Sequence, residues 1–300
     1  ILGTHGAATE TGRAAVSALS QAFAQTDDWR GTLALVEQRV EAATDPIARA
    51  QVLRETARLS EERAGDLAAA LTFAARAMPL GSQDKALLAE TETEVHRLAE
   101  AVGDWSAVVL YYQITLRALE GAPGSQGVAF RLGEVLESRV GDLPEALASF
   151  DQVAREAPGD RDAALAVIRV GARIDRWEAV ARAFVAHAAA VGTLDKDLVA
   201  HVEAAAAAQP STDDVWRALT LATERAVASE RRATALARDL DTQLAIWHRD
   251  RRADRAAAEG ALTRAIAHDP HDPRALRMLA DLRRDRPDGV LIETLLALAA

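Results

Sequence analysis

The chain of 300 residues contains no cysteine. Disulfides, zinc-thiolate sites and thiol nucleophiles are therefore excluded, while the compartment stays open between cytoplasm and periplasm. Aromatic residues make up 4% of the chain, and no apolar run approaches the length of a membrane span. The start at Ile1 has neither an initiator methionine nor the pattern of a signal peptide, so we expect a segment of a longer protein.

Strand signals are also missing, because no stretch of alternating valine, isoleucine or tyrosine lies between turn residues. Apolar residues nevertheless make up 49% of the chain, with alanine prominent in many windows. Alanine has the highest helix propensity and little β-propensity. The composition therefore predicts an all-α protein.

An excess of positive charge is absent, since 45 acidic residues outnumber 35 basic ones and the net charge is −10. This balance argues against a general binder of polyanions. The charge is uneven: residues 229–287 hold 13 arginines and 10 acids, whereas the first 228 residues carry −11. Lysine occurs only at Lys85 and Lys196, and the preference for arginine and alanine is typical of a GC-rich genome.

The most informative feature that is present is a short pattern repeated eight times: a turn with aspartate or glycine, often followed by tryptophan or leucine, and then an apolar helix. The copies are Asp27-Asp28-Trp29, Gly65-Asp66-Leu67, Gly103-Asp104-Trp105, Gly141-Asp142-Leu143, Asp175-Arg176-Trp177, and the weaker Asp214-Val215-Trp216, Ala253-Asp254-Arg255 and Pro287-Asp288-Gly289. Successive copies are 38, 38, 38, 34, 39, 39 and 34 residues apart. Such a period predicts stacked helical hairpins, in one array over residues 1–300 with turns near 28, 66, 104, 142, 176, 215, 254 and 288.

Each turn is followed by an amphipathic helix, and room for one more helix lies before the next turn. From Trp105 and from Trp177 the apolar residues follow at offsets 3, 4, 7, 11 and 14, which is one buried helix face. Further helices are expected near residues 47–63, 84–101, 125–140, 160–174 and 229–248. About sixteen helices in eight pairs result, and the boundaries within 212–259, which lack glycine and proline, are the least defined.

The recurring tryptophans at positions 29, 105, 177 and 216 are expected to pack between hairpins, because they repeat with the period. A core position is also favoured for Trp247, which breaks the series. Tyr112 joins a buried stripe, which leaves Tyr111 as a possible surface contact. His187 lies among alanines on a helix face, where a packed or half-exposed histidine is expected.

Residues 126–160 resemble a tetratricopeptide repeat. The residues that carry the resemblance are Leu132-Gly133 in the first helix, Gly141-Asp142 in the turn, and Ala146, Phe150 and Pro158 in the second helix, with one extra residue near Val140. Residues 258–280 and 65–77 match the same pattern, whereas other copies depart from it. The resemblance implies a right-handed α-solenoid of about eight antiparallel helix hairpins whose concave face, formed by the first helix of each pair, binds proteins or peptides.

Carrying that face over to matching positions gives a set of partner-binding residues. These are Phe130, Glu134, Glu137, Ser138, Asp162, Arg169, Arg173, Arg274, Arg277, Asp281 and Arg284. The lysine and asparagine arrangement with which chaperone-binding members of the family hold a terminal carboxylate is not visible in this sequence.

Other motifs favour structural interpretations. Residues 268–273, His-Asp-Pro-His-Asp-Pro, coincide with a turn between repeats and have no third ligand at metal-site spacing, so a turn is favoured over a metal site. The glycines at 121, 124 and 127 follow no strand and precede no Lys-Ser or Lys-Thr pair, which favours a linker over a phosphate loop. No catalytic triad or carboxylate pair stands out, so we expect no catalytic residues, no metal and no cofactor.

The arginines at 249, 251, 252 and 255, with those at 283, 284 and 286, allow three interpretations. A salt-bridged solvated face is favoured because Asp250, Asp254 and Asp285 lie among them; an acidic protein partner comes second, and RNA third.

The sequence therefore predicts a non-catalytic scaffold that binds other proteins or peptides. A structural spacer or assembly element, stacking through open solenoid ends, is the alternative, because the apolar residues 295–300 would need a cover. An RNA-binding helical-repeat protein is the third hypothesis.

Overall fold

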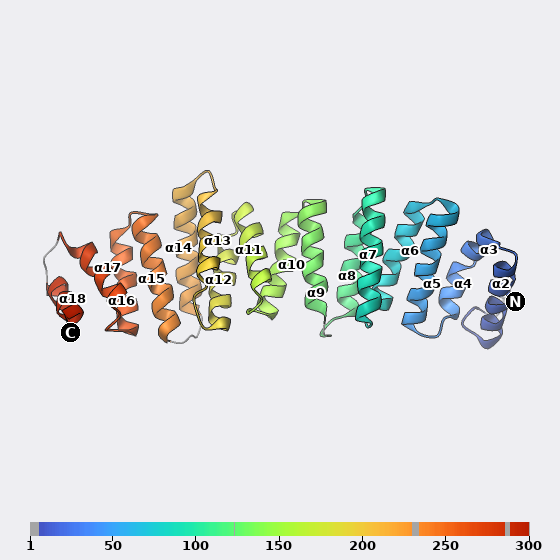
Figure 1. Cartoon of the computed structure of the whole chain (residues 1–300), viewed down its shortest axis with the longest axis horizontal. Helices are drawn as coiled ribbons and strands as arrows, with labels where there is room; N and C mark the ends of the chain where they lie inside the picture. The colour runs from blue at the N-terminus through green and yellow to red at the C-terminus, as the bar shows by residue number, and fades with distance from the viewer. Residues whose placement is uncertain (1–5, 123, 230–233, 286–288, 300) are drawn as a thin grey trace. The chain divides into compact units, whose positions relative to one another are not determined.

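The computed structural model describes residues 6–122, 124–229, 234–285 and 289–299. Within these ranges the chain forms 17 α-helices and two π-helical segments and contains no strand (Figure 1). Adjacent helices pack against each other. The all-α prediction is therefore confirmed.

Contacts between Cα atoms divide the chain into two compact units, Ile1–Asp142 and Leu143–Ala300. The first unit contains α2 (Glu10–Gln25), α3 (Trp29–Ala34), α4 (Val36–Ala42), α5 (Pro46–Leu59), η1 (Ser60–Ala64), α6 (Leu67–Gly81), α7 (Lys85–Val102), α8 (Ser106–Ala118), α9 (Ser125–Val135) and η2 (Leu136–Val140). In this unit α5 packs on α6, and α6 packs on both α7 and α8. The single array over residues 1–300 stays a prediction.

The second unit contains α10 (Leu143–Glu156), α11 (Arg161–Arg173), α12 (Trp177–Val191), α13 (Lys196–Ala207), α14 (Thr212–Ser229), α15 (Thr234–Asp250), α16 (Arg255–His268), α17 (Pro273–Arg283) and α18 (Gly289–Ala299). Helix α11 packs on both α10 and α12, and helices two apart also meet, as α11 with α13 and α12 with α14. This is the contact pattern of stacked hairpins.

The repeated turn has a specific backbone conformation. Its first residue has a positive φ, with values of 67°, 76° and 80° at Gly65, Gly103 and Gly141. In three copies the next residue, Asp28, Asp66 or Asp254, caps the following helix; the side chain of Asp66, for example, accepts a hydrogen bond from the amide of Ala69. The pattern in the sequence is therefore a left-handed residue followed by a helix N-cap.

Three copies place a residue other than glycine in the left-handed position. Asp27, Asp175 and Ala253 have φ of 52°, 55° and 49°. Aspartate tolerates this conformation better than alanine, because its short polar side chain can hydrogen-bond locally. Ala253 is thus the strained member of the series.

One of the expected turns lies at another position, and one falls outside the described residues. The turn predicted near residue 215 lies earlier, at residues 208–211, and Asp214 to Trp216 belong to α14. Pro210 explains the shift, because proline is disfavoured inside a helix, and the acids at 213 and 214 suit a first turn. The turn predicted near residue 288 falls within 286–288, outside the described residues. Residues 230–233, between α14 and α15, are also outside them.

The extra residue expected near Val140 lies in a π-helical segment, η2, and a second such segment, η1, precedes the turn at Gly65. A π-turn closes its hydrogen bonds over one more residue than an α-turn, so it accommodates the insertion without breaking the helix.

The large side chains at the centre of the second unit confirm most of the predicted core. Phe150 is fully buried, and Trp247 packs against Phe184 and Trp216 with ring centroids 5.9 and 6.0 Å apart. Tyr112, in the first unit, is also fully buried. The recurring tryptophans do not behave alike, since Trp177 and Trp216 are buried, whereas Trp29 and Trp105 are partly exposed.

Candidate functional site

A groove with a volume of about 420 Å³ lies between α11 and α13, which begin two consecutive hairpins of the second unit. Its lining residues are Leu165, Ile168, Arg169, Ala172, Arg173, His201, Ala205, Ala208 and Gln209. They recur one turn apart, at 165, 168–169 and 172–173 on α11 and at 201, 205 and 208–209 on α13 and just past its end, so each set forms one stripe. The groove is the space between two facing stripes.

Caps and close packing fix the two helices. Asp160 caps α11 and Asp195 caps α13. Each side chain accepts hydrogen bonds from backbone amides in the first turn of its own helix. Arg161 joins the two helix starts, with its Nε 3.1 Å from Asp195 Oδ2. On the opposite side of α11, a Cβ added to Gly171 would lie 2.9 Å from Val180 Cγ2, so glycine allows α12 to approach α11 closely.

The floor of the groove is apolar and its edges are polar. Ile168 and Ala172 are buried, and Leu165 and Ala205 are partly exposed. At one end, Gln209 Nε2 donates to the carbonyl of Ala172 over 3.0 Å and covers the end of α11.

The basic side chains at the edge are Arg169, Arg173 and His201. Both arginines are exposed, and each has interactions within the chain. The Arg169 guanidinium lies 6.0 Å from the centre of the Phe150 ring. His201 Nδ1 lies 2.7 Å from the carbonyl oxygen of Asp197.

The structure distributes the predicted binding residues over several places. Arg169 and Arg173 line the groove between α11 and α13, whereas Asp162 is an exposed residue in the first turn of α11. The contribution of α13 was missed, because no helix over 196–207 was singled out; the spacing of His201, Ala205 and Gln209 was the available signal.

A second groove, of about 390 Å³, contains three further predicted residues. Arg277, Asp281 and Arg284 line it with Ala280, Leu291, Leu295 and Leu298, between α17 and α18. Arg284 Nη2 and Asp281 Oδ1 form an ion pair 2.5 Å long. Arg274 lies outside this lining, and its amide donates to the Asp272 cap.

The four predicted residues of the first unit lie on α9 and η2. Glu134 and Ser138 are exposed, with the Ser138 hydroxyl donating to the Glu134 carbonyl. Phe130 and Glu137 are partly buried and have interactions of their own. None of these four residues lines either groove.

A polar network around Tyr112 joins α7, α8 and α9. The Tyr112 hydroxyl lies 2.9 Å from His96 Nε2, and Arg131 pairs with the buried Glu92 at 2.9 Å. Burial raises the pKa of Tyr112 and of Glu92 and lowers the pKa of His96. Because Tyr112 is fully buried, its hydroxyl is closed to a substrate, and the network serves helix packing.

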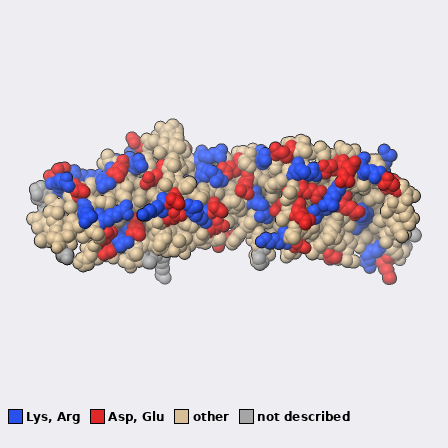
Figure 2. Space-filling view, in the orientation of Figure 1, with Lys and Arg blue, Asp and Glu red and all other residues tan. Residues whose placement is uncertain are grey.

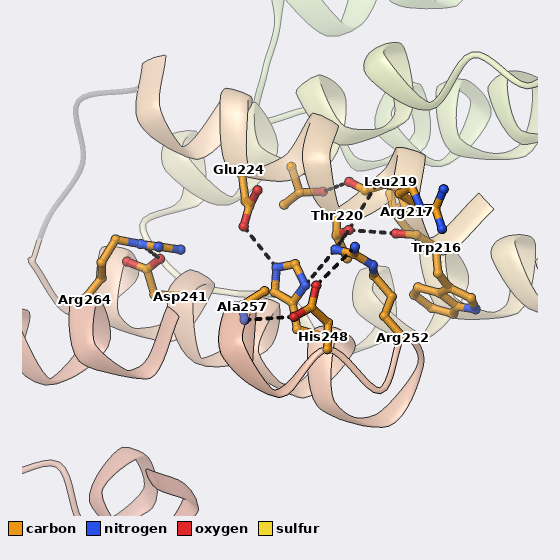
Figure 3. A network of polar contacts seen from close by, with 12 residues as sticks. Trp216, Arg217, Leu219, Thr220, Glu224, Asp241, His248, Arg252, Ala257 and Arg264 are labelled. Atoms are coloured by element: carbon orange, nitrogen blue, oxygen red, sulfur yellow. Dashed lines mark hydrogen bonds and ion pairs between the residues drawn. The ribbon is translucent and has the colours of Figure 1, made fainter. Parts of the chain in front are cut away.

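A second buried network surrounds His248 in the other unit (Figure 3). His248 Nε2 lies 3.0 Å from Glu224 Oε1, and Arg252 Nη1 lies 3.0 Å from His248 Nδ1 and 3.2 Å from Thr220 Oγ1. A guanidinium can only donate, so Nδ1 accepts and the proton of the neutral ring is on Nε2. Burial lowers the pKa of His248, although the hydrogen bond to Glu224 acts in the opposite direction.

The arginine cluster at 249–286 is a salt-bridged face over its described members, as the favoured interpretation predicted. Arg249 pairs with Asp250, Arg252 with Asp254, and Arg283 with Glu259; the further pairs are Arg251 with Glu203, Arg255 with Asp285 and Arg284 with Asp281. Arg286 lies outside the described residues. Acidic and basic side chains alternate over the visible surface (Figure 2). This pairing adds no support for RNA binding.

Over the described ranges, no group of three or more histidine or acidic side chains is placed to hold a metal ion. No helix there is both long and apolar enough for a membrane span. In comparisons with known proteins, no family model matches the chain and no curated protein gives a significant match. The resemblance to tetratricopeptide repeats therefore depends on the motif residues alone.

Proposed function

We propose that the chain is a non-catalytic scaffold that binds a segment of a partner protein in the groove between α11 and α13. In this proposal the helices form a tetratricopeptide-like, right-handed solenoid of about eight hairpins. The groove is the observation that carries the proposal.

Three properties of the groove support binding of a protein segment. Its volume of about 420 Å³ is within the range of ordinary ligand sites. Its apolar floor and polar edges match the anatomy of protein interfaces. It lies between the first helices of two hairpins, where the family resemblance places ligands. The buried networks at Tyr112 and His248 favour structural roles over catalysis.

A display library of random peptides, selected on the intact chain, tests the proposal. Ala208 lines the groove and is exposed, so Ala208→Trp should fill the groove without disturbing the core. The neighbouring Ala207 is exposed and outside the lining, which makes Ala207→Trp the matched control.

Selected peptides should bind the wild-type chain and the Ala207→Trp variant and lose affinity for Ala208→Trp by at least about tenfold, which corresponds to about 1.4 kcal/mol. Equal binding to both variants would show that the groove is the wrong surface. Circular dichroism should show the same helix content in all three proteins.

A role in assembly is the second proposal, and the exposed apolar face of α18 favours it. Ile292 and Leu296 are 60% and 66% exposed. Isolated apolar residues are common on surfaces, but here several share one helix. Static light scattering of the wild type and of an Ile292→Lys, Leu296→Lys variant checks it: self-association that disappears in the variant supports assembly, and two monomers would exclude it.

A further inference from the structure

The groove between α11 and α13 differs in charge from the chain around it. The chain has a net charge of −10, yet none of the nine side chains that line the groove is acidic, and three are basic or imidazole groups. The lining thus combines an apolar floor with basic side chains at its edge, in a chain that is acidic as a whole.

We propose that the occupant of the groove is an acidic segment with one central apolar side chain. The inference depends on the proposed function, since it names the chemistry of the partner at the same site. The apolar side chain lies on the floor formed by Leu165, Ile168 and Ala205, and flanking carboxylates meet Arg169 and Arg173.

The positions of the two arginines suit this occupant. They are four residues apart on α11, so their side chains leave the same face of the helix one turn apart. Carboxylates on either side of an apolar residue can therefore reach both. Guanidinium–carboxylate pairs are charge-assisted and often bidentate, which gives direction as well as affinity.

The existing contacts of these arginines determine how such a segment binds. Both have interactions within the chain, and Arg169 also lies over the Phe150 ring. An incoming carboxylate therefore shares or replaces these contacts, and affinity arises from the floor and the charges together. Side chains that are already held lose less freedom on binding than mobile ones.

Three fluorescent synthetic peptides separate these contributions. The first has a central leucine flanked by two glutamates on each side, the second replaces the glutamates with lysines, and the third replaces the leucine with serine. Fluorescence anisotropy with the full chain should show the first peptide binding at least about tenfold more tightly than the other two. Its affinity should fall as salt is added, because the charges are near the surface.

The variants locate the binding. Arg169→Glu with Arg173→Glu should weaken the first peptide by at least about tenfold. Arg217→Glu with Arg225→Glu makes the same change in net charge at exposed positions of α14 and should have little effect. Ala208→Trp should abolish binding, and Ala207→Trp should preserve it.

Each contrary result is distinct. If the first peptide does not bind, or binds equally to both charge-reversal variants, the acidic occupant is wrong. If library peptides that depend on Ala208 are neutral or basic, the inference fails while the proposed function stands. If library peptides ignore Ala208→Trp, the groove itself is the wrong site and both fail.

Discussion

Replacing Ala253 with glycine should stabilise the protein. Ala253 is exposed and has φ of 49°, in the turn between α15 and α16. The left-handed conformation costs an L-residue roughly 1 to 2 kcal/mol. Glycine removes this cost but adds backbone entropy to the unfolded chain, worth about 0.4 to 1 kcal/mol. The net stabilisation should be about 0.5 to 1 kcal/mol.

The reverse change provides the control. Gly103 occupies the same position of the turn with φ of 76°, and no heavy atom lies within 4 Å of a Cβ added there. Gly103→Ala therefore introduces strain without a clash, and should destabilise the α7–α8 hairpin by about 0.5 to 1 kcal/mol.

The measurement has to be local, because a repeat array need not unfold in one step. Native-state hydrogen exchange of the amides in α15 and α16 reports the opening free energy of that hairpin. Slower exchange in Ala253→Gly and faster exchange of α7 and α8 amides in Gly103→Ala are expected. If Ala253→Gly exchanges faster than the wild type, the left-handed strain does not limit this turn.

Two further predictions concern buried groups. Phe150→Ala should cost about 3 to 5 kcal/mol of unfolding free energy, because the ring is fully buried; an unchanged urea midpoint would show that the ring contributes little to the core. The pKa of His248 is lowered from its ordinary value of about 6.5, mainly by burial, so the unfolded chain binds more protons below that pH. This contribution to stability should be complete above about pH 6.5, decline as pH falls below it, and level off under the folded-state pKa. Ring titration by NMR and urea midpoints across this range check it: His248→Gln should flatten the pH dependence of the α14–α16 region, and a folded-state pKa above 6.5 would reverse the sign.

The fold could be predicted to the extent that it repeats. The left-handed residue recurs at Asp27, Gly65, Gly103, Gly141 and Ala253, and Asp28, Asp66 and Asp254 cap the helices that follow, so a single sequence pattern gave the starts of the second helices in these hairpins. The turn near residue 215 was misplaced because a tryptophan follows the turn directly in other copies, whereas Trp216 lies inside a helix. It lies in the second turn of α14, whereas Trp177 begins α12.

The groove could be predicted only in part, because it requires two helices to face each other. Arg169 and Arg173 could be predicted from the sequence of α11 alone, through the family resemblance. Their counterparts His201 and Gln209 depend on the packing of α13 against α11, and a run of five alanines at 204–208 offers no residue that stands out. Small side chains are the reason that a groove exists there, yet in a sequence they look like ordinary helix formers.

The residues of α11 that pack in the core and those that face the groove have separate roles. Val167, Val170 and Gly171 are buried, and Gly171 lets α12 approach, so changes there alter the spacing of helices. Leu165, Arg169 and Arg173 lie four residues apart on the stripe that faces the groove, where a change of side chain leaves the packing against α12 in place. A helical repeat can therefore vary this stripe without losing its stack. Under the proposed function, specificity for a partner would be determined mainly by positions 165, 169 and 173 of α11, by positions 201 and 205 of α13, and by Ala208 at the C-cap of α13.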